Sequence, residues 1–354
     1  MASFAIEEVK GAPAARGKCC VVVDPASNPH IAFGTMAGHA AIASRSGDGW
    51  AVEEIFGTGA LRPEVEEPVR FQIDSAGNPH ICYQAMGGTA FYGVRLDGRW
   101  TFTELKTNRF NEPGTVSGLA FALHPGRFTP ELKDTPHIIA GDQSSDALVY
   151  LRLVDGALKR VVVTEPVDLG DGGNSSTGLC SSMMFEDDTI QMAYVEVAAN
   201  ISRIKSRRIL EPGGESFSNE FLFDEGRFFV AATSVFSGFE TWIAYCSITD
   251  RVLTVAAKVS GHDLSEKVAD VLGRMVPSMA RNEFLGGRPE GTLRIAYSDR
   301  ERLKLASRRL GQGWVVEEID DAAHGAPSLA YDRNAKGHLA YNVGTTLKYV
   351  KVTE

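Results

Sequence analysis

The stretch Asp74-Ser75-Ala76-Gly77-Asn78-Pro79-His80-Ile81-Cys82-Tyr83 is the clearest copy of a segment that returns along the whole chain. Its second half, residues 79–83, has six further copies, at residues 29–33, 136–140, 190–194, 241–245, 293–297 and 337–341. In chain order the steps between the seven copies are 50, 57, 54, 51, 52 and 44 residues. A period of this size is typical of propellers and related repeat arrays.

One repeat, residues 18–55, predicts four strands. Its first strand is continuously apolar, as in a strand buried on both faces, and a turn rich in Asp, Asn and Pro follows it. An Asp-Gly hairpin leads into the last strand, which alternates polar and apolar residues. A four-stranded antiparallel meander of about fifty residues matches a propeller blade. The four strands are expected over residues 19–23, 30–35, 40–45 and 50–55.

The two ends of the chain are expected to complete one blade together. After the seventh copy only one more strand is predicted, over residues 346–352, so the last blade lacks its fourth strand. Residues 4–9 resemble the fourth strands at 50–55 and 314–319, and they would close the fold and remove exposed sheet edges. We therefore expect an all-β, single-domain seven-bladed β-propeller over residues 1–354, built from four-stranded antiparallel blades and closed by the N-terminal strand.

Composition restricts the class of partner. A net charge of −9 argues against nucleic acid or an anionic membrane as a partner, because both require a basic surface. No apolar run is long enough to span a bilayer, and residues 1–10 lack the features of a secretory signal. Five cysteines without a CxxC pair predict free thiols. These features favour a cytoplasmic protein.

The long linkers between blades point to a face for binding. Residues 56–68, 106–117 and 164–180 favour the face over blades 2 to 4, because long loops on a rigid scaffold often carry binding groups. Near the start of the first strands, Arg70 replaces the small residues found in other blades. A guanidinium there is expected to hold an anionic ligand group or, alternatively, to form a structural ion pair. Its ion-pair candidates are Glu66, Glu67 and Asp142, and the small residues are Cys20, Gly118, Ser182, Ser278 and Ser328.

Polar residues that follow the second strands differ from blade to blade. Carboxylates that converge near Arg70 would supply a general acid and a general base. Alternatively, each carboxylate faces solvent in a short loop. The candidate catalytic residues are Arg70, Asp142, Glu196 and Asp299, and the candidate substrate-binding residues are Gln84, Arg109, Gln143, Arg300 and Asn342.

Four histidines occupy one equivalent position, at the start of the second strands: His30, His80, His137 and His338. Strand spacing would hold them roughly 8–10 Å apart, too far for a shared zinc whose ligands lie within about 2.0–2.1 Å of the metal. We therefore expect hydrogen bonds between blades and no metal site or cofactor, with a divalent cation left as an open alternative. Tryptophans that follow the hairpin turns are expected to pack on neighbouring blades; they are Trp50, Trp100 and Trp314.

The repeat consensus, roughly D-x-x-G-x-P-H-I-A-Y followed by G-x-W-x-x-E, resembles a broad group of bacterial seven-bladed propellers. The resemblance implies the fold, which lectins, polysaccharide lyases and other propeller enzymes share. It assigns no catalytic residue, and residues 46–50 are too short to match the sialidase-type Asp box S-x-D-x-G-x-x-W. Function therefore has to be argued from the site.

The favoured function is an enzyme with one asymmetric polar pocket at the central-channel face. Its chemistry would be acid–base catalysis by side chains, of lyase, hydrolase or cyclisation type, on a small anionic or sugar-like substrate. The support is that Arg70 and the loop carboxylates are not repeated around the blades. A carbohydrate-binding lectin, which would repeat its polar residues, and a protein-interaction scaffold are the alternatives. The expected partner is a small-molecule or carbohydrate ligand.

Overall fold

The computed structural model of the chain consists of β-sheets with almost no helix. It describes residues 2–353 except 56–68, 86, 109, 111, 155, 166–175, 187, 199–200, 211–215, 227–228, 238–239, 248, 260–261, 273–275, 282–292, 301, 310–312 and 323. Over these residues the strands form seven four-stranded antiparallel sheets, and the fold is the seven-bladed β-propeller that the repeats predict. The one helical turn in this part of the chain is η1 (Pro130–Leu132), and no helix there is long and apolar enough to cross a membrane.

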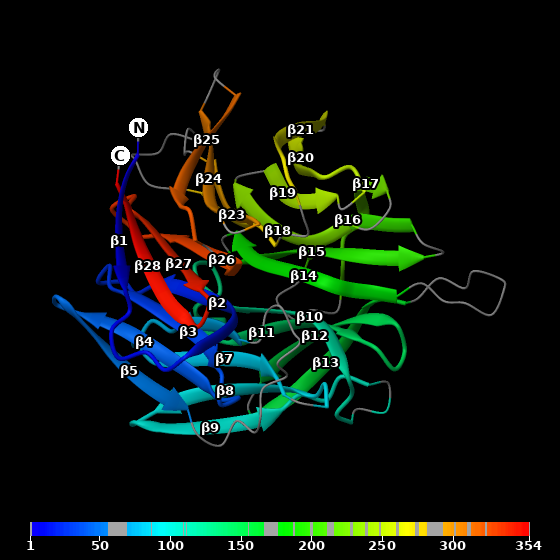
Figure 1. Ribbon diagram of the computed structural model, residues 1–354. Coiled ribbons are helices and arrows are strands. Elements are labelled where there is room, and N and C mark those ends of the chain that lie inside the picture. Colours follow the sequence, from blue (N-terminus) through cyan, green and yellow to red (C-terminus); the bar gives the residue numbers. More distant parts are fainter. Residues whose placement is uncertain are drawn as a thin grey trace. The chain divides into compact units, whose positions relative to one another are not determined.

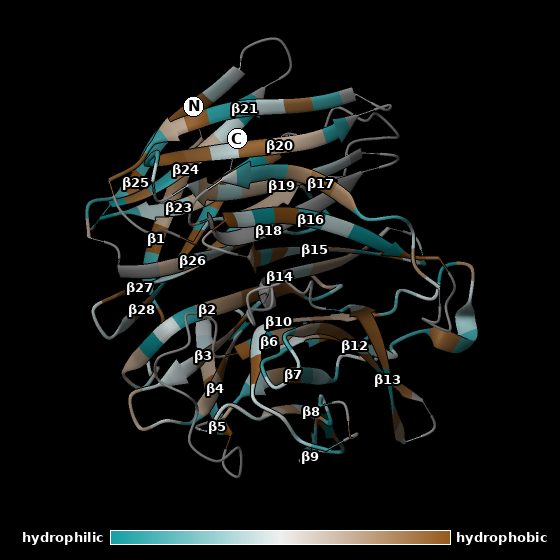
Figure 2. Ribbon diagram, turned by 90° about the vertical axis from the view of Figure 1, so that its right-hand side faces the viewer, coloured by the Kyte–Doolittle hydropathy of each residue, from teal (hydrophilic) through white to brown (hydrophobic). Residues whose placement is uncertain are grey.

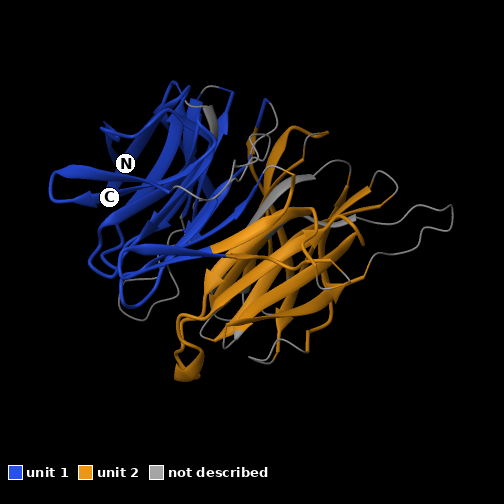
Figure 3. Cartoon of the chain, turned by 90° about the horizontal axis from the view of Figure 1, so that it is seen from below, with its two compact units in different colours: residues 1–86, 93–102, 271–354 blue, residues 87–92, 103–270 orange. Residues whose placement is uncertain are grey.

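Two compact units divide the blades (Figure 3). Unit 1 comprises residues 1–86, 93–102 and 271–354, and unit 2 comprises residues 87–92 and 103–270. Blade 2 has residues in both units, and its strands are β6 (Val69–Ile73), β7 (Pro79–Gln84), β8 (Ala90–Leu96) and β9 (Arg99–Glu104).

Three complete blades belong to unit 1. Blade 1 consists of β2 (Ala15–Val23), β3 (Pro29–Thr35), β4 (Ala40–Ser46) and β5 (Gly49–Ile55). Blade 6 consists of β22 (Ser278–Arg281), β23 (Leu293–Asp299), β24 (Arg302–Arg309) and β25 (Gly313–Asp320). Blade 7 consists of β26 (His324–Tyr331), β27 (Gly337–Val343), β28 (Thr346–Thr353) and β1 (Ser3–Glu8).

Three further blades belong to unit 2. Blade 3 consists of β10 (Val116–Leu123), β11 (Pro136–Asp142), β12 (Ala147–Val154) and β13 (Ala157–Thr164). Blade 4 consists of β14 (Ser176–Glu186), β15 (Thr189–Ala198), β16 (Ile201–Ile209) and β17 (Phe221–Gly226). Blade 5 consists of β18 (Phe229–Ser237), β19 (Glu240–Ser247), β20 (Val252–Val259) and β21 (His262–Asp270).

The N-terminal strand completes the last blade, as predicted. β1 pairs antiparallel with β28, from Ser3 opposite Thr353 to Glu8 opposite Lys348. The two ends of the chain therefore lie side by side (Figure 1). Trp50 of blade 1 donates its indole N–H to Glu7 of β1 at 3.0 Å, which confirms for this tryptophan the predicted contact with a neighbouring blade.

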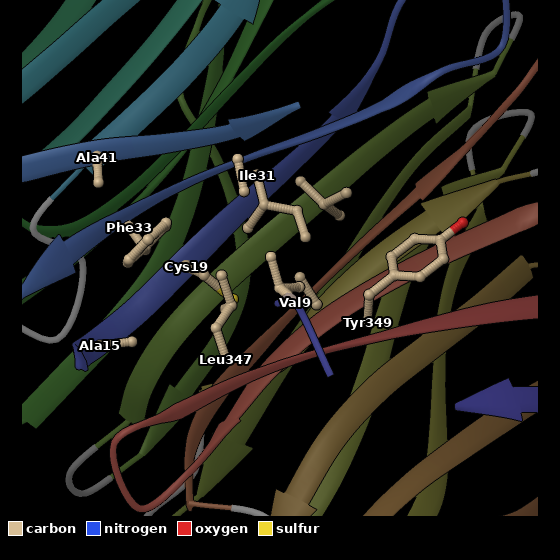
Figure 4. Packing of buried hydrophobic residues seen from close by; sticks show 11 residues of the cluster. Val9, Ala15, Cys19, Ile31, Phe33, Ala41, Leu347 and Tyr349 are labelled. Carbon is tan, nitrogen blue, oxygen red and sulfur yellow. The ribbon is translucent and has the colours of Figure 1, made fainter. Parts of the chain in front are cut away.

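Apolar side chains between blades 7 and 1 form one core of unit 1 (Figure 4). Cys19, Ile31 and Leu347 come from β2, β3 and β28, and none is more than 1% exposed. The apolar first strands are buried between sheets because each blade packs on its neighbours. Figure 2 shows a contrast between an inner and an outer strand of unit 2. The third strand of blade 3, β12, is largely hydrophobic, whereas the last strand of blade 5, β21, contains both hydrophobic and hydrophilic residues, as expected for a strand with one solvent face.

The first strands of blades 1, 3, 4, 5 and 7 share a bulge that the sequence analysis missed. In blade 1 the register moves from Arg16 opposite Gly34 to Cys20 opposite Ala32, so the first strand carries extra residues. The same irregularity opens β10, β14, β18 and β26. Gly17 has a left-handed φ of 74°, a conformation that glycine adopts without steric cost. Gly17 is the sequence signal for the bulge of β2, and Gly118, with a φ of 56°, lies in the bulge of β10.

The motif from Asp74 to His80 folds as a turn that is locked within its own blade. Asp74 Oδ1 accepts the backbone N–H groups of Ala76 at 2.9 Å and Asn78 at 2.7 Å. Its other oxygen faces His80 Nε2 at 3.4 Å. Gly77 takes the left-handed position of the turn, with φ at 88°. We call this pairing of a turn aspartate with the strand histidine the turn lock.

Blades 1 and 7 repeat the turn lock. Asp24 faces His30 Nε2 at 3.4 Å, and Asp332 faces His338 Nε2 at 3.6 Å. The other ring nitrogen binds a hydroxyl of the third strand, that of Ser44 at 2.9 Å for His30 and that of Tyr349 at 2.6 Å for His338. The predicted hydrogen-bonding role is therefore present, but the prediction that it joins neighbouring blades was wrong: these contacts lie within one blade.

Candidate functional site

Three of the predicted catalytic residues are carboxylates near the ends of second strands. Asp142 ends β11, Glu196 lies two residues before the end of β15, and Asp299 ends β23. Asp142 and Glu196 are each 1% exposed, and Asp299 is 6% exposed. A buried carboxylate requires hydrogen bonds or a cation. The three carboxylates differ in the groups that bind them, and these groups decide which of the three are held in ion pairs.

Glu196, in unit 2, is held by two cations. Lys205 Nζ lies 2.7 Å from one oxygen, and Arg203 Nη1 lies 3.1 Å from the other. Lys205 also reaches Glu220 at 2.7 Å, and the Tyr194 hydroxyl donates to Glu220 at 2.5 Å. Burial opposes ionisation of Glu220, but the hydrogen bonds from Lys205 and Tyr194 hold its pKa below the usual range. Glu196 therefore has the surroundings of a structural ion pair.

Asp299, in unit 1, is also paired with a cation. Lys304 Nζ lies 2.8 Å from Asp299 Oδ2, and the backbone N–H of Leu272 donates to Oδ1 at 2.8 Å. Burial raises the pKa of Asp299, but these two hydrogen bonds outweigh it and leave the pKa below its usual value. Arg300, the next residue, is exposed and has a left-handed φ of 59°.

Asp142, in unit 2, is held by neutral groups. It accepts the backbone N–H of Ser144 at 3.0 Å, the Ser144 hydroxyl at 2.7 Å and the Ser145 hydroxyl at 2.5 Å. Hydroxyl groups can turn to donate or accept, so they can support either protonation state of a carboxyl group. Asp142 therefore differs from Glu196 and Asp299, each of which is paired with a lysine.

The linker ahead of blade 3 packs directly on Asp142. A Cβ atom on Gly114 would lie 2.9 Å from Thr107 Oγ1 and 3.3 Å from Asp142 Oδ1, so this close approach requires glycine. Thr107 is fully buried, and its hydroxyl has no hydrogen-bond partner within the part of the chain that the structure describes. Gln143 is exposed, and its backbone N–H donates to a linker carbonyl at 2.9 Å. Arg109, also in this linker, lies outside the described residues.

In unit 1, one position of the first strands links consecutive blades. Ser278 Oγ accepts the backbone N–H of Leu329 at 3.0 Å, and Ser328 Oγ accepts that of Val21 at 3.0 Å. The Cys20 thiol donates to a β6 carbonyl at 3.8 Å. The small residues at this position therefore connect blade 6 to 7, 7 to 1 and 1 to 2.

Arg70 occupies the same position in blade 2. It stands opposite Cys82, as Cys20 stands opposite Ala32 in blade 1, and it is half-buried. Burial raises the pKa of the Cys20 and Cys82 thiols, and the positive charge of Arg70 acts in the opposite direction on both. The guanidinium is thus a charged exception in a series of small side chains. Two of its predicted ion-pair partners, Glu66 and Glu67, fall outside the described residues.

Two predicted substrate-binding residues directly follow the buried aromatic residue of their second strands. Gln84 on β7 and Asn342 on β27 are each 4% exposed. Asn342 Nδ2 donates to the carbonyl of Gly17, in the bulge of blade 1, at 2.6 Å. Asn342 Oδ1 is buried and accepts no hydrogen bond from any residue described in the structure.

The predicted site residues fall into two groups. Asp142, Gln143 and Glu196 belong to unit 2, and the described residues of unit 1 in the set are Arg70, Gln84, Asp299, Arg300 and Asn342. Each of the three carboxylates finds its partners in its own blade or in the adjoining linker. Convergence on one pocket stays a prediction. Over the described ranges, no cluster of three or more His, Cys, Asp or Glu side chains could hold a metal ion.

Comparison with solved structures shows the fold that this chain shares. It is similar to an ulvan lyase, a polysaccharide lyase solved bound to GlcA(1-4)Rha3S, with a TM-score of 0.63 at 12% identity over 96% of this chain and 94% of that one. A lectin from Burkholderia pseudomallei matches with a TM-score of 0.55 at 14% identity over 98% and 96% of the chains. An α-L-arabinofuranosidase from Fusarium graminearum matches at 0.57 and 12% identity over 83% and 94%. No protein family and no curated protein matches the sequence.

Proposed function

We propose that this propeller acts on carbohydrate and that Arg70 holds an anionic group of the substrate. The observation that carries the proposal is the position of Arg70, where other blades have Ser or Cys side chains that bridge to the next blade. A half-buried guanidinium suits a carboxylate or sulfate group, which it can bind with two parallel hydrogen bonds. The similar ulvan lyase, solved with a GlcA-containing ligand, supports an acidic sugar as the ligand class.

The proposed acid–base residue is Asp142. Glu196 and Asp299 are each paired with a lysine, at 2.7 and 2.8 Å, so their carboxylates are engaged in structural ion pairs. Among the described residues, the donors to Asp142 are a backbone N–H and two hydroxyl groups, so no ion pair competes with a role in proton transfer there. The proposed reaction is a lyase, hydrolase or cyclisation step that needs proton transfer by a side chain.

The first experiment is a thermal-shift screen of the purified protein against uronates, sulfated and neutral oligosaccharides and small organic acids. A ligand that binds only the folded state raises the melting temperature by mass action. We expect an acidic sugar to do so at one site per chain. Arg70→Ala should abolish that rise in melting temperature. The control is Arg95→Ala, which removes a guanidinium that lies 2.9 Å from Glu53 of the outer strand β5, and it should keep the rise.

The second experiment separates enzyme from lectin. With the ligand in hand, Asp142→Asn should retain binding and lose at least a hundredfold in turnover, within the range of a lost general acid or base. Asp299→Asn serves as the matched control and should keep turnover. If neutral sugars bind at several sites per chain without turnover, the protein is a lectin and the proposal is wrong.

A further inference from the structure

The acid–base residue proposed above lies beneath the surface of its blade. Asp142 is 1% exposed, although it ends β11 and a turn follows it. The linker ahead of blade 3 packs against it, since a Cβ atom on Gly114 would lie 3.3 Å from Asp142 Oδ1. Proton transfer requires heavy atoms within about 2.6–3.2 Å of each other, a distance that a sugar chain at the surface does not reach from a buried carboxylate. A proton that moves between Asp142 and a substrate therefore has to pass through a group that contacts both.

Two hydroxyl groups of the turn contact the carboxylate. Ser144 Oγ donates to Asp142 Oδ1 at 2.7 Å, and Ser145 Oγ donates to Oδ2 at 2.5 Å. Each carboxylate oxygen thus has a hydroxyl of its own. A hydroxyl group both donates and accepts hydrogen bonds, so it can take up one proton while it releases another. Either serine therefore has the chemistry of a proton relay.

Exposure distinguishes the two serines. Ser144 is exposed, whereas Ser145 is half-buried. The position of Ser144 is also fixed, because its backbone N–H donates to the same Asp142 Oδ1 at 3.0 Å. The preceding backbone N–H, that of Gln143, donates to the carbonyl of Thr115 in the linker at 2.9 Å. Ser144 therefore connects the buried carboxylate to the surface from a turn that is held in place.

Blade 5 contains a serine–aspartate pair at the same turn, with the two groups exchanged. Ser247 ends β19, as Asp142 ends β11, and its hydroxyl donates to Asp250 Oδ2 at 2.7 Å. Ser247 is 3% exposed, and Asp250 is exposed. That arrangement is the less costly one, because burial of a carboxylate costs more free energy than burial of a hydroxyl. A pair that only fastens the turn gains nothing from the reversed order of blade 3, whereas a relay requires the hydroxyl at the surface.

We propose that Ser144 is the catalytic residue that contacts the substrate and carries a proton between it and Asp142. This inference rests on the proposed function of Asp142. When the site acts as a base, the substrate proton bonds to Ser144 Oγ while the Ser144 hydroxyl proton moves to Asp142 Oδ1. The electron pair of the broken bond stays on the substrate, and Asp142 becomes a neutral acid. When the site acts as an acid, the same two transfers run in reverse, and Ser144 is unchanged at the end.

The test measures turnover of polyglucuronate and polygalacturonate from the release of new reducing ends. Ser144→Ala removes the hydroxyl but keeps the backbone N–H that binds Asp142, so its melting temperature should equal that of the unmodified protein. Its kcat should fall about a hundredfold, within the range of a lost general acid or base. Ser144→Thr keeps a hydroxyl and should recover most of that loss. Ser247→Ala, which removes the hydroxyl of the pair in blade 5, is the matched control and should keep turnover.

Two outcomes would overturn the role of Ser144 and leave the proposed function standing. One is full turnover by Ser144→Ala while Asp142→Asn is inactive, because a water molecule would then carry the proton. The other is a loss in Ser145→Ala as large as that in Ser144→Ala, because both hydroxyls would then act only by holding the carboxylate. Full turnover by Asp142→Asn, or no turnover of either polymer by the unmodified chain, would instead contradict the proposed function, and this inference with it.

Discussion

Glu7, on the strand closest to the N-terminus, accepts the indole N–H of Trp50 at 3.0 Å, although the two residues belong to different blades. One blade further on, Glu53 accepts the indole N–H of Trp100 at 3.2 Å. An arginine of the third strand joins each pair. The G-x-W-x-x-E part of the repeat is therefore a clamp between consecutive blades, in which the tryptophan of one copy binds the glutamate of the copy before it.

Deletion of residues 1–8 should lower the melting temperature sharply. It removes β1 and exposes the edge of β28, from Lys348 to Thr353, to solvent. Glu7→Gln, which keeps the strand and weakens only the clamp, should change stability by about 0–1 kcal/mol, because ion pairs that water reaches contribute little. Equal effects of the two changes, measured by calorimetry, would show that the strand pairing does not close the fold.

Ser328→Ala should destabilise the protein by about 1–3 kcal/mol, the range for a buried donor left without an acceptor. The donor is the backbone N–H of Val21, which Ser328 Oγ accepts at 3.0 Å in a buried setting. Ser3→Ala removes an exposed hydroxyl pair with Thr353 and is the control, with an expected change within about 0.5 kcal/mol. Urea unfolding measures both. A loss no larger than that of the control would mean that these bridges between blades are dispensable.

The left-handed position of the turn lock predicts substitutions of opposite sign. Gly77 has φ at 88° with open space around its missing Cβ, so Gly77→Ala should cost about 1 kcal/mol through backbone strain alone. Ala335 holds the equivalent position in blade 7 at a φ of 64°. Ala335→Gly should relieve that strain and, after the entropy cost of glycine, gain up to about 1 kcal/mol. Thermal unfolding that ranks the two changes in the reverse order would contradict this assignment.

Stability should fall as the pH drops below about 6.5, the ordinary pKa of histidine in an unfolded chain. Burial lowers the pKa of four histidines, and that of His137 is held well below its usual range, with the charges of His124 and Arg152 adding to burial. The unfolded chain then binds more protons than the folded one, so the slope of stability with pH is positive there. Above pH 7 these groups contribute no slope.

Melting temperatures between pH 8 and pH 5 check this expectation. The aspartates of the turn locks do not interfere in that range, because hydrogen bonds outweigh burial and lower their pKa values, so their contribution is lost only below about pH 4. His137→Gln cannot be protonated and should give a shallower slope. A profile that stays flat down to pH 5 would mean that the buried histidines bind protons as readily as exposed ones.

The repeats were sufficient to predict the blades because each strand sequence has one strong local signal. The apolar run of β2, the Asp-Gly hairpin before Trp50 and the likeness of β1 to β5 each depend on a few neighbouring residues. The bulge of the first strands was missed because its signal is one glycine, such as Gly17, that periodicity does not detect. The span of β2 was therefore predicted from Cys19 to Val23, whereas the strand begins at Ala15.

The candidate site was less predictable because its chemistry depends on partners distant in sequence. Nothing near Asp299 in the chain shows that Leu272 donates to it, and the same spacing after a second strand gives Glu196 two cations and Asp142 only neutral donors. His124 lies outside the seven copies of the repeated segment, so the repeat alone does not single it out. Its equivalence to Asp74 became visible through the strand register, because the turn of blade 3 is longer than those of the other blades.

The antiparallel pairing of β1 with β28 also determines how the protein responds to mechanical force. Ser3 lies opposite Thr353, so both chain ends emerge at the same end of the strand pair. Tension applied to the two termini would load the cross-strand hydrogen bonds one pair after another, like a zipper, rather than all together as in shear. A protein tethered at both ends should therefore open first at blade 7 and at low force. Attachment through one terminus would leave that seam unloaded.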